Sequence, residues 1–300
     1  EDGTYTDTTY ASTGDDENAL RVDGATVTLD GITVDKSAGA AFNTENGDFY
    51  GVNAALLATN GANVTITNGT VTSSAQNGNG VFSYGSGTTV DISESMITTT
   101  ADNSGGIQTT GGTANNSEAL VIEGKNSITL ENCDVTGNMS DTKGSSSEEN
   151  VHNVMIYQST SGDADVGTST FSMTSGTLTA KNGDMIYVTN THCVLTLSGV
   201  TIKNEDADGA LLRVVGNSAS HGWGTAGSNG AQVEFTADGQ TLTGDIVVDT
   251  ISTLNMTLQN GSSFTGTINI VDNAQGGTAV SNNAVVTIES GCTWTLTGDC

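Results

Sequence analysis

The chain has 300 residues, of which 34 are acidic and 7 are basic, so its formal net charge is −27 at pH 7. Nucleic acids and anionic membrane surfaces repel such a chain, because it has almost no cations with which to replace their counterions. No apolar run approaches the roughly 18 residues that span a bilayer, and the opening EDGTYTDTTY is neither a basic nor an apolar leader. We therefore expect no nucleic-acid partner and no membrane insertion.

Cysteine spacing and hydrophobic content further narrow the class of protein to which the chain can belong. None of the four cysteines has the CxxC spacing of zinc sites or thioredoxin-type centres, and the spacing of Cys292 and Cys300 permits a disulfide without establishing one. Hydrophobic residues make up 35% of the chain, which is low for a globular protein. Their regular placement is what argues against disorder.

Nine-residue segments with a common pattern recur along the chain. The clearest are TVTLDGITV (26–34), NVTITNGTV (63–71) and VLTLSGVTI (194–202), each with an apolar anchor, a short polar turn and a second apolar residue further on. A unit of roughly twenty residues plus insertions is typical of a solenoid or a propeller. The anchors are Leu29, Ile66, Ile92, Leu130, Met173 and Leu197, with weaker copies at Phe235, Met256 and Ile288.

The turns between these segments distinguish coils from hairpins. The stretch ALRVDGATVTLDGITV (19–34) turns twice at Asp-Gly. An Asp-Gly between short strands can mark a hairpin, but here the strands are very short and the copies are alike at a coil-sized period. We therefore interpret each Asp-Gly as a corner, with every strand pairing with its equivalent one coil above and below. The sequence predicts an all-β, parallel β-helix solenoid of about nine coils, one for each anchor.

The inward Leu, Ile, Val and Met side chains would form one continuous core, so residues 1–300 are expected to be a single domain without a linker. The last residues, TWTLTGDC (293–300), stop in the middle of a coil pattern, and we expect the natural chain to continue with further coils. An uncapped solenoid presents unpaired strand edges at its ends, which permits end-to-end self-association.

Acidic turns precede equivalent strands in several coils. In GDDENALRV (14–22) and NEDADGALLRV (204–214) the acids lead into a Leu-Arg-Val strand. NGDMIYV (182–188) has the same arrangement with fewer acids. Coils about 4.8 Å apart would bring these carboxylates close together, which favours a neutralising cation such as calcium. The candidate calcium ligands are Asp15, Asp16, Glu17, Asp163, Asp165, Asp184, Asn204, Asp206 and Asp208, with Glu118 on the same expected edge.

The segment 204–214 supports two interpretations. Asn204, Asp206 and Asp208 alternate before Gly209, as at the start of a calcium loop, but no acidic residue follows where such a loop would close. The alternative is a set of solvated turns, in which Asp and Asn are common for backbone reasons and the charge confers solubility.

Arg21 and Arg213 lie in the strands that follow these turns, each between two apolar residues that point inward, so both side chains are expected to point outward. Calcium with an outward arginine is what β-elimination of uronates requires, since the metal acidifies the proton beside the carboxylate and the arginine removes it. The alternative is that each arginine pairs with neighbouring carboxylates.

The glycine-rich insertion 216–230 carries Trp223 and His221. A tryptophan on a loop can stack on a sugar ring, since binding residues concentrate on loops of rigid scaffolds, or it can pack as a lid on the wall of the solenoid. The three histidines lie on distant coils, so neither a zinc cluster nor a catalytic triad is expected. Outward threonines such as Thr28 and Thr65 suggest an ice-binding face, which the irregular coil lengths argue against.

Several motifs resemble those of a family of secreted β-helix proteins from anaerobic bacteria, known as carbohydrate-binding-domain-containing or adhesin-like proteins. The similarity covers nearly the whole chain, except at 109–120, where the family typically has further coils. It implies a right-handed parallel β-helix, a secreted or cell-surface location, bound calcium at the acidic turns, and binding of acidic plant polysaccharide such as polygalacturonate. The motifs are DNSGGI (102–107), VIEGKNS (121–127), YQSTSGDAD (157–165), NGDMIYVTNT (182–191), the pair LLRV and WGTAGSNG, LTGDIVVDTISTLNMTLQNGSSFTG (242–266) and WTLTGD (294–299).

We therefore expect a non-catalytic, calcium-dependent surface module that holds acidic polysaccharide, with calcium as cofactor and Trp223, Arg21 and Arg213 as ligand-binding residues. A protein at −27 and a polyuronate repel each other, and seven scattered basic residues cannot form a basic patch, so cations between the two are needed. The alternatives are a calcium-dependent pectate-type lyase and a structural surface or filament subunit.

Overall fold

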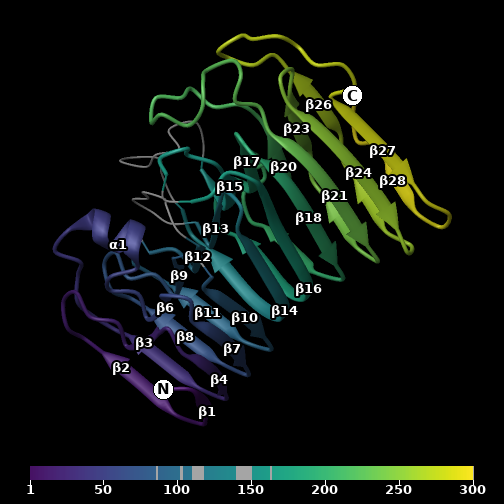
Figure 1. The fold of residues 1–300 in the computed structure, drawn as a ribbon. Coiled ribbons are helices and arrows are strands. Elements are labelled where there is room, and N and C mark those ends of the chain that lie inside the picture. Colours follow the sequence, from purple (N-terminus) through teal and green to yellow (C-terminus); the bar gives the residue numbers. More distant parts are fainter. Residues whose placement is uncertain (86, 102–103, 110–117, 140–150, 163, 300) are drawn as a thin grey trace. The chain divides into compact units, whose positions relative to one another are not determined.

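The computed structural model describes residues 1–300 except 86, 102–103, 110–117, 140–150, 163 and 300. The fold is all-β: short strands stack in parallel on their equivalents in successive coils, as in a parallel β-helix solenoid (Figure 1). Its handedness and its number of coils stay predictions. No helix among the described residues is long and apolar enough to cross a membrane.

The chain divides into two compact units, which are described separately. Unit 1 comprises Glu1–Val121 and Ile128–Glu148, and unit 2 comprises Ile122–Ser127 and Glu149–Cys300. The expectation that the whole chain forms one domain stays a prediction.

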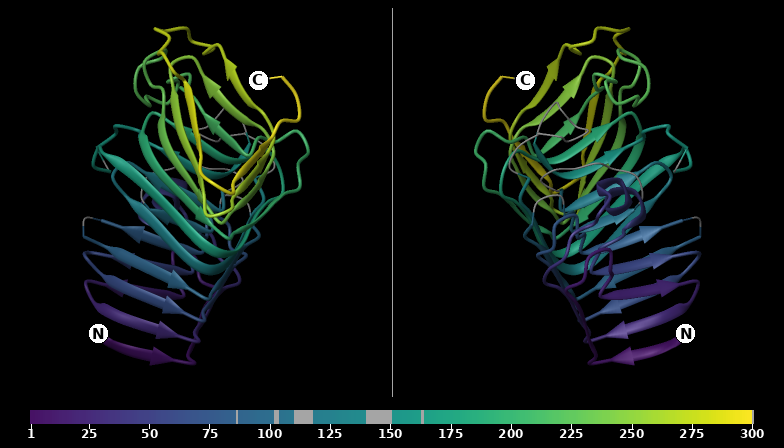
Figure 2. Two further views of the ribbon diagram at one scale, coloured as in Figure 1. Left: turned by 90° about the vertical axis from the view of Figure 1, so that its right-hand side faces the viewer. Right: turned by 90° about the vertical axis from the view of Figure 1, so that its left-hand side faces the viewer.

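Unit 1 contains three parallel ladders, whose strands lie like rungs one above the other (Figure 2, purple to blue). A helix, α1 (Thr44–Tyr50), is inserted between β5 and β6. The first ladder is β1 (Gly3–Thr6), β4 (Thr26–Asp30), β7 (Asn63–Thr67), β10 (Thr89–Ser93) and part of β14 (Ser127–Gly137); the second is β2 (Thr9–Ser12), β5 (Thr33–Lys36), β8 (Thr70–Ser73), β11 (Met96–Thr99) and the rest of β14; the third is β3 (Leu20–Asp23), β6 (Leu56–Thr59), β9 (Val81–Tyr84) and β12 (Ile107–Thr109), followed along the chain by β13 (Leu120–Glu123).

Unit 2 is built in the same way. Its longest strand, β16 (Thr168–Ala180), pairs with β18 over its first half and with β19 (Thr201–Asn204) over its second half. The first ladder is β16, β18 (His192–Ser198), β21 (Gln232–Asp238), β24 (Thr253–Gln259) and β27 (Ala284–Ile288); the second is β15 (His152–Tyr157), β17 (Asp184–Thr189), β20 (Leu212–Val214), β23 (Ile246–Asp249) and β26 (Ile268–Val271); the third is β22 (Thr241–Thr243), β25 (Ser263–Thr265) and β28 (Thr293–Thr295).

The predicted inward anchors form the core columns. In unit 1 the pairing register places Leu29, Ile66, Ile92 and Leu130 in one column, and in unit 2 Met173 pairs with Leu197. All six side chains are buried, at 4% exposure or less. Because apolar residues lie on apolar residues of the next coil, each column is continuous. The anchor of every coil is therefore shielded from water by its neighbours.

Two of the three weaker copies, Phe235 and Met256, lie two residues out of register with the anchors. The third, Ile288, is in register with Leu197, but it is 46% exposed and so is not the inward core position that was predicted. Phe235 and Met256 pair in the column of Leu195, whereas Leu197 pairs with Ala237. The side chains of a strand alternate with a period of two, so a shift of two residues keeps an apolar residue inward and leaves no trace in the polarity pattern. Both residues are nevertheless buried, as expected of core positions.

The Asp-Gly pairs form corners of the coil, as predicted. Gly24 and Gly31 follow β3 and β4 with φ angles of 62° and 64°, a left-handed conformation that glycine adopts without strain. At the first corner, Asp23 Oδ1 accepts a hydrogen bond of 2.7 Å from Asn60 of the next coil. Corner residues therefore pair between coils, just as the strands do.

We expect Leu197→Ala to lower the free energy of unfolding by roughly 2–5 kcal/mol, because it leaves a cavity in a fully buried column. Chemical denaturation monitored by circular dichroism would measure the change. Thr196→Ala, on the outward face of the same strand, is the matched control and should change stability by less than about 1 kcal/mol. Equal effects of the two substitutions would contradict the inward assignment of Leu197.

Candidate functional site

The acidic turn of segment 204–214 is organised by its own backbone. Asp206 Oδ2 accepts the Gly183 N–H at 2.8 Å, and its Oδ1 accepts the Asp208 N–H at 3.0 Å. Asn204 Oδ1 accepts the Asp206 N–H at 3.1 Å. These hydrogen bonds favour the charged form of Asp206, and those from Gly183 and then Asp208 lower its carboxyl pKa. The turn therefore uses its carboxylate and amide oxygens to join two coils of unit 2.

The buried carboxylate of Asp184 forms an ion pair with the partly exposed Arg213 beside this turn. Arg213 Nε donates a short hydrogen bond to Asp184 Oδ2, and Nη2 donates to Oδ1 at 3.2 Å. Asp184 Oδ1 also accepts the Ala210 N–H at 2.7 Å. Burial acts to lower the pKa of Arg213, but the hydrogen bond and the charge of Asp184 outweigh it, so the pKa is raised. Arg213 thus takes the ion-pairing role that was the alternative to catalysis.

The acids of the turn in segment 14–22 lie in unit 1, where they too accept hydrogen bonds. Asp15 Oδ1 accepts the Ala40 N–H and Asp16 Oδ1 accepts the Phe42 N–H, both at 2.9 Å. Glu17 Oε2 accepts a hydrogen bond of 3.0 Å from Ser12 Oγ. These contacts attach the turn to the segment that follows β5.

The remaining predicted residues are scattered. Asp163 lies outside the described residues, and Asp165 is exposed on a loop of unit 2. Arg21 is exposed in unit 1 and pairs with Asp23 at 2.9 Å, which again matches the ion-pairing alternative. Glu118 is buried in unit 1.

The described acids do not present a ready calcium site. Calcium takes six to eight oxygens that converge on one point, whereas the oxygens of Asp184, Asp206 and Glu17 accept N–H and O–H donors from their own unit. Within the part of the chain that the structure describes, no three His, Cys, Asp or Glu side chains gather as a metal group. As arranged, this donor set does not fit the ion, and calcium binding stays a prediction.

Trp223 packs on the wall of unit 2. Its side chain is only 6% exposed, and its ring centroid lies 4.5 Å from that of Tyr157. Asn229 Nδ2 donates to the Trp223 carbonyl at 2.9 Å, which fixes the loop. The geometry is that of the lid interpretation, and stacking of Trp223 on a sugar would require the ring to leave Tyr157.

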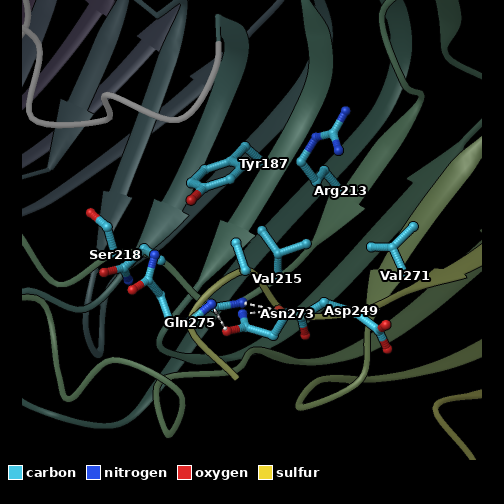
Figure 3. Close-up of a pocket in the computed structure, with 12 residues that line it drawn as sticks. Tyr187, Arg213, Val215, Ser218, Asp249, Val271, Asn273 and Gln275 are labelled. Carbon is cyan, nitrogen blue, oxygen red and sulfur yellow. Dashed lines mark hydrogen bonds between the residues drawn. The ribbon is translucent and has the colours of Figure 1, made fainter. Parts of the chain in front are cut away.

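A cavity of about 320 Å³ lies at the carboxyl ends of strands β17, β20, β23 and β26 in unit 2. Figure 3 shows Tyr187 and Arg213 on one side of Val215, and Asn273 and Asp249 on the other. Tyr187 and Arg213 are direct neighbours between paired strands. The remaining lining residues are Gly216, Asn217, Ser218, Val271, Asp272, Ala274 and Gln275.

Asp249 holds the lower wall of this cavity together. It is 2% exposed, and its Oδ2 accepts the Gly216 N–H at 2.8 Å and the Asn273 side-chain amide at 2.5 Å. Asn273 Oδ1 in turn accepts the Gln275 N–H at 2.9 Å. A Cβ on Gly216 would lie 2.9 Å from Asn273 Nδ2, so a larger residue there would have to displace the Asn273 side chain. Two loops far apart in the sequence thereby form one wall.

Sequence analysis identified Arg213 but not the rest of this cavity. The register pairs Tyr187 with Arg213, and an alignment of NGDMIYV with the Leu-Arg-Val strand is the signal that could have identified Tyr187. The stretch 272–275, by contrast, reads as an ordinary polar loop, and no sequence signal joins it to Gly216. No family model, curated protein or solved structure matches the chain.

We expect the hydrogen bonds of Asp206 to make stability depend on pH. Because the folded pKa lies below the usual 3.8, the carboxylate stabilises the fold above about pH 4, and this contribution is lost as the pH falls through the folded pKa. The melting temperature of the unmodified chain should exceed that of Asp206→Asn at about pH 7, and the gap should close as the pH falls below 3.8 and through the folded pKa.

Asp208→Asn is the matched control, since this neighbour is exposed and only its backbone N–H bonds to Asp206. Its melting temperature should follow that of the unmodified chain across the same pH range. A gap for Asp206→Asn that does not change with pH would show that the carboxylate contributes no charge-dependent stability.

Proposed function

We propose that the chain is a non-catalytic module of the cell surface that binds acidic polysaccharide, and that the cavity of unit 2 is the binding site. The observation that carries this proposal is the placement of Arg213, which lines the cavity and is held in position by two hydrogen bonds to Asp184. The resemblance to secreted carbohydrate-binding β-helices points to the same class of ligand.

Arg213 supplies a contact for a uronate carboxylate. Its side chain is 30% exposed, and Nε and Nη2 are occupied by Asp184. Among the described residues, Nη1 has no hydrogen-bond partner, so its N–H groups are available to a ligand. A guanidinium held in one orientation loses little conformational entropy when it binds a carboxylate.

The opposite side of the cavity suits sugar hydroxyls. Asp272 and Gln275 are exposed, and neither side chain has a hydrogen-bond partner within the described part of the chain. A carboxylate accepts hydrogen bonds from hydroxyl groups, and an amide both donates and accepts them. One cation on one wall with neutral and anionic acceptors on the other matches a sugar that has one carboxylate and several hydroxyls.

The same geometry favours binding over β-elimination. A lyase of the type considered above needs an arginine that loses its proton, whereas Asp184 raises the pKa of Arg213 and so keeps it protonated. Arg21 is exposed and paired with Asp23. We therefore assign Arg213 to ligand recognition and not to proton transfer.

Long-range repulsion sets the conditions for binding. A protein at −27 repels a polyuronate at low ionic strength, and screening by salt reduces this repulsion. Calcium would screen most effectively and could also bridge carboxylates of the protein and the glycan, which is the calcium dependence expected from the sequence. Comparison of calcium with sodium at equal ionic strength separates bridging from screening.

The test is retention of polygalacturonate by the Arg213→Gln variant. We expect at least a tenfold loss of affinity, because the variant removes the charge that faces the ligand carboxylate. Affinity would be measured by isothermal titration with oligogalacturonates, in calcium and in sodium chloride of equal ionic strength. Unchanged ultraviolet absorbance during the titration would exclude release of unsaturated uronates.

Arg21→Gln is the matched control, because this arginine also pairs with an aspartate but lies in unit 1, away from the cavity. Its affinity should equal that of the unmodified chain. Failure of the unmodified chain to bind any acidic glycan, with or without calcium, would overturn the proposed function.

A second candidate is a structural subunit that associates with further copies of itself. Strands β26, β27 and β28 each pair with one neighbour among the described strands (Figure 1, yellow). Exposed large hydrophobic side chains gather on and beside them. These are Ile270, Val271, Val280, Val285, Ile288 and Leu296, each between 38% and 58% exposed.

If this surface drives association, sedimentation should show the unmodified chain forming oligomers as its concentration rises, and Ile288→Glu should abolish them. Ile288 continues the buried column of Leu258 and is 46% exposed, so a charge there opposes apolar contact. Val166→Glu, at a 73% exposed position elsewhere in unit 2, is the control and should leave association unchanged. A chain that stays monomeric at all concentrations would contradict this second candidate.

A further inference from the structure

Each unit places a basic side chain of its own against an acidic turn. In unit 1 Lys36 lies under the turn that contains Asp15 and Glu17, and in unit 2 Arg213 lies against Asp184. The chain has only seven basic residues against 34 acidic ones, and two of these few cations lie beside acidic turns. This pattern goes beyond glycan binding and does not depend on it.

Lys36 is fully buried, which is rare for lysine. Its ammonium donates a short hydrogen bond to the Gly14 carbonyl and a second, of 3.3 Å, to Ser12 Oγ. Ser12 Oγ donates onward to Glu17 Oε2 at 3.0 Å. Burial lowers the pKa of Lys36, and the charges of Glu17 and Asp15 act in the opposite direction. The ammonium thus contacts two oxygens at the start of the turn.

Arg213 has the corresponding role in unit 2, although it lies in a different ladder. Its two hydrogen bonds hold both oxygens of Asp184, a carboxylate that is only 4% exposed. An unpaired carboxylate buried to this degree would be strongly destabilising. The Gly183 N–H, next to Asp184, binds Asp206, so the ion pair and the acidic turn form one connected group.

We infer that Lys36 and Arg213 are built-in counter-cations that neutralise the acidic turns, so that each unit folds without calcium. A lysine or arginine side chain brings its charge covalently, and no ion has to be taken up from solution. Any requirement for calcium would then belong to the encounter with an acidic glycan and not to the stability of the fold.

The first test is the melting temperature of the protein stripped with chelator, measured across a calcium chloride titration and a sodium chloride titration of equal ionic strength. We expect the two curves to coincide. A rise specific to calcium would overturn the inference, because a ligand that binds the folded state raises its stability.

The second test is a pair of double-mutant cycles, Lys36→Met with Glu17→Gln and Arg213→Gln with Asp184→Asn. In each cycle we expect the double variant to lose less melting temperature than the two single variants together, since removal of the anion relieves the need for the cation. Additive losses in both cycles would overturn the inference. The two cycles lie in different units, so the second decides the matter if Lys36→Met does not fold.

Lys181→Met is the matched control. Lys181 pairs with Glu205 at 2.9 Å, but both side chains are at least 42% exposed, so the variant should melt close to the unmodified chain. The Arg213→Gln variant also keeps this test separate from the binding proposal, because loss of glycan affinity and loss of melting temperature are measured independently. A calcium-insensitive protein that binds no glycan would support the inference and refute only the proposed function.

Discussion

The stacking of equivalent residues at the interstrand distance of about 4.8 Å is the constraint on which the structure depends. In each unit the pairing register places a residue above its counterpart in the next coil, so the character of one position is repeated along a column. Repetition benefits apolar residues, as in the column of Leu29, Ile66 and Ile92, because each coil covers the one before it. It penalises charge, because like charges in one column repel at close range.

Hydrogen bonds and the few basic side chains of the chain offset this repulsion between like charges. At the corners, Asn60 and Asn260 donate to Asp23 and Asp238 of an adjacent coil, so an aspartate faces an amide and not a second aspartate. Two acidic turns also have a basic side chain beside them, Lys36 in unit 1 and Arg213 in unit 2. The net charge of −27 is therefore carried mainly by solvated positions, and it confers solubility without opposing the fold.

Sequence reasoning succeeded where a column repeats and failed where it does not. The inward anchors from Leu29 to Leu197 and the Asp-Gly corners both follow from alignment of one coil with the next. The two-residue displacement of Phe235 was invisible because alternation has a period of two. The cavity wall was unpredictable for a different reason: Gly216 and Asn273 are joined by Asp249 in space, and neither loop has an equivalent in the other coils.

The position of the cavity follows from the same difference between the strands, which repeat from coil to coil, and the loops, which do not. Parallel strands β17, β20, β23 and β26 end at one edge, and the chain leaves the ladder there through loops of unequal length. The strands supply a rigid floor in which Tyr187 and Arg213 are fixed by their register. The loops supply Asp272 and Gln275, which are free of the spacing that the columns impose. In unit 2 the loops at this edge can therefore change the chemistry of one coil while the pairing of its neighbours stays intact.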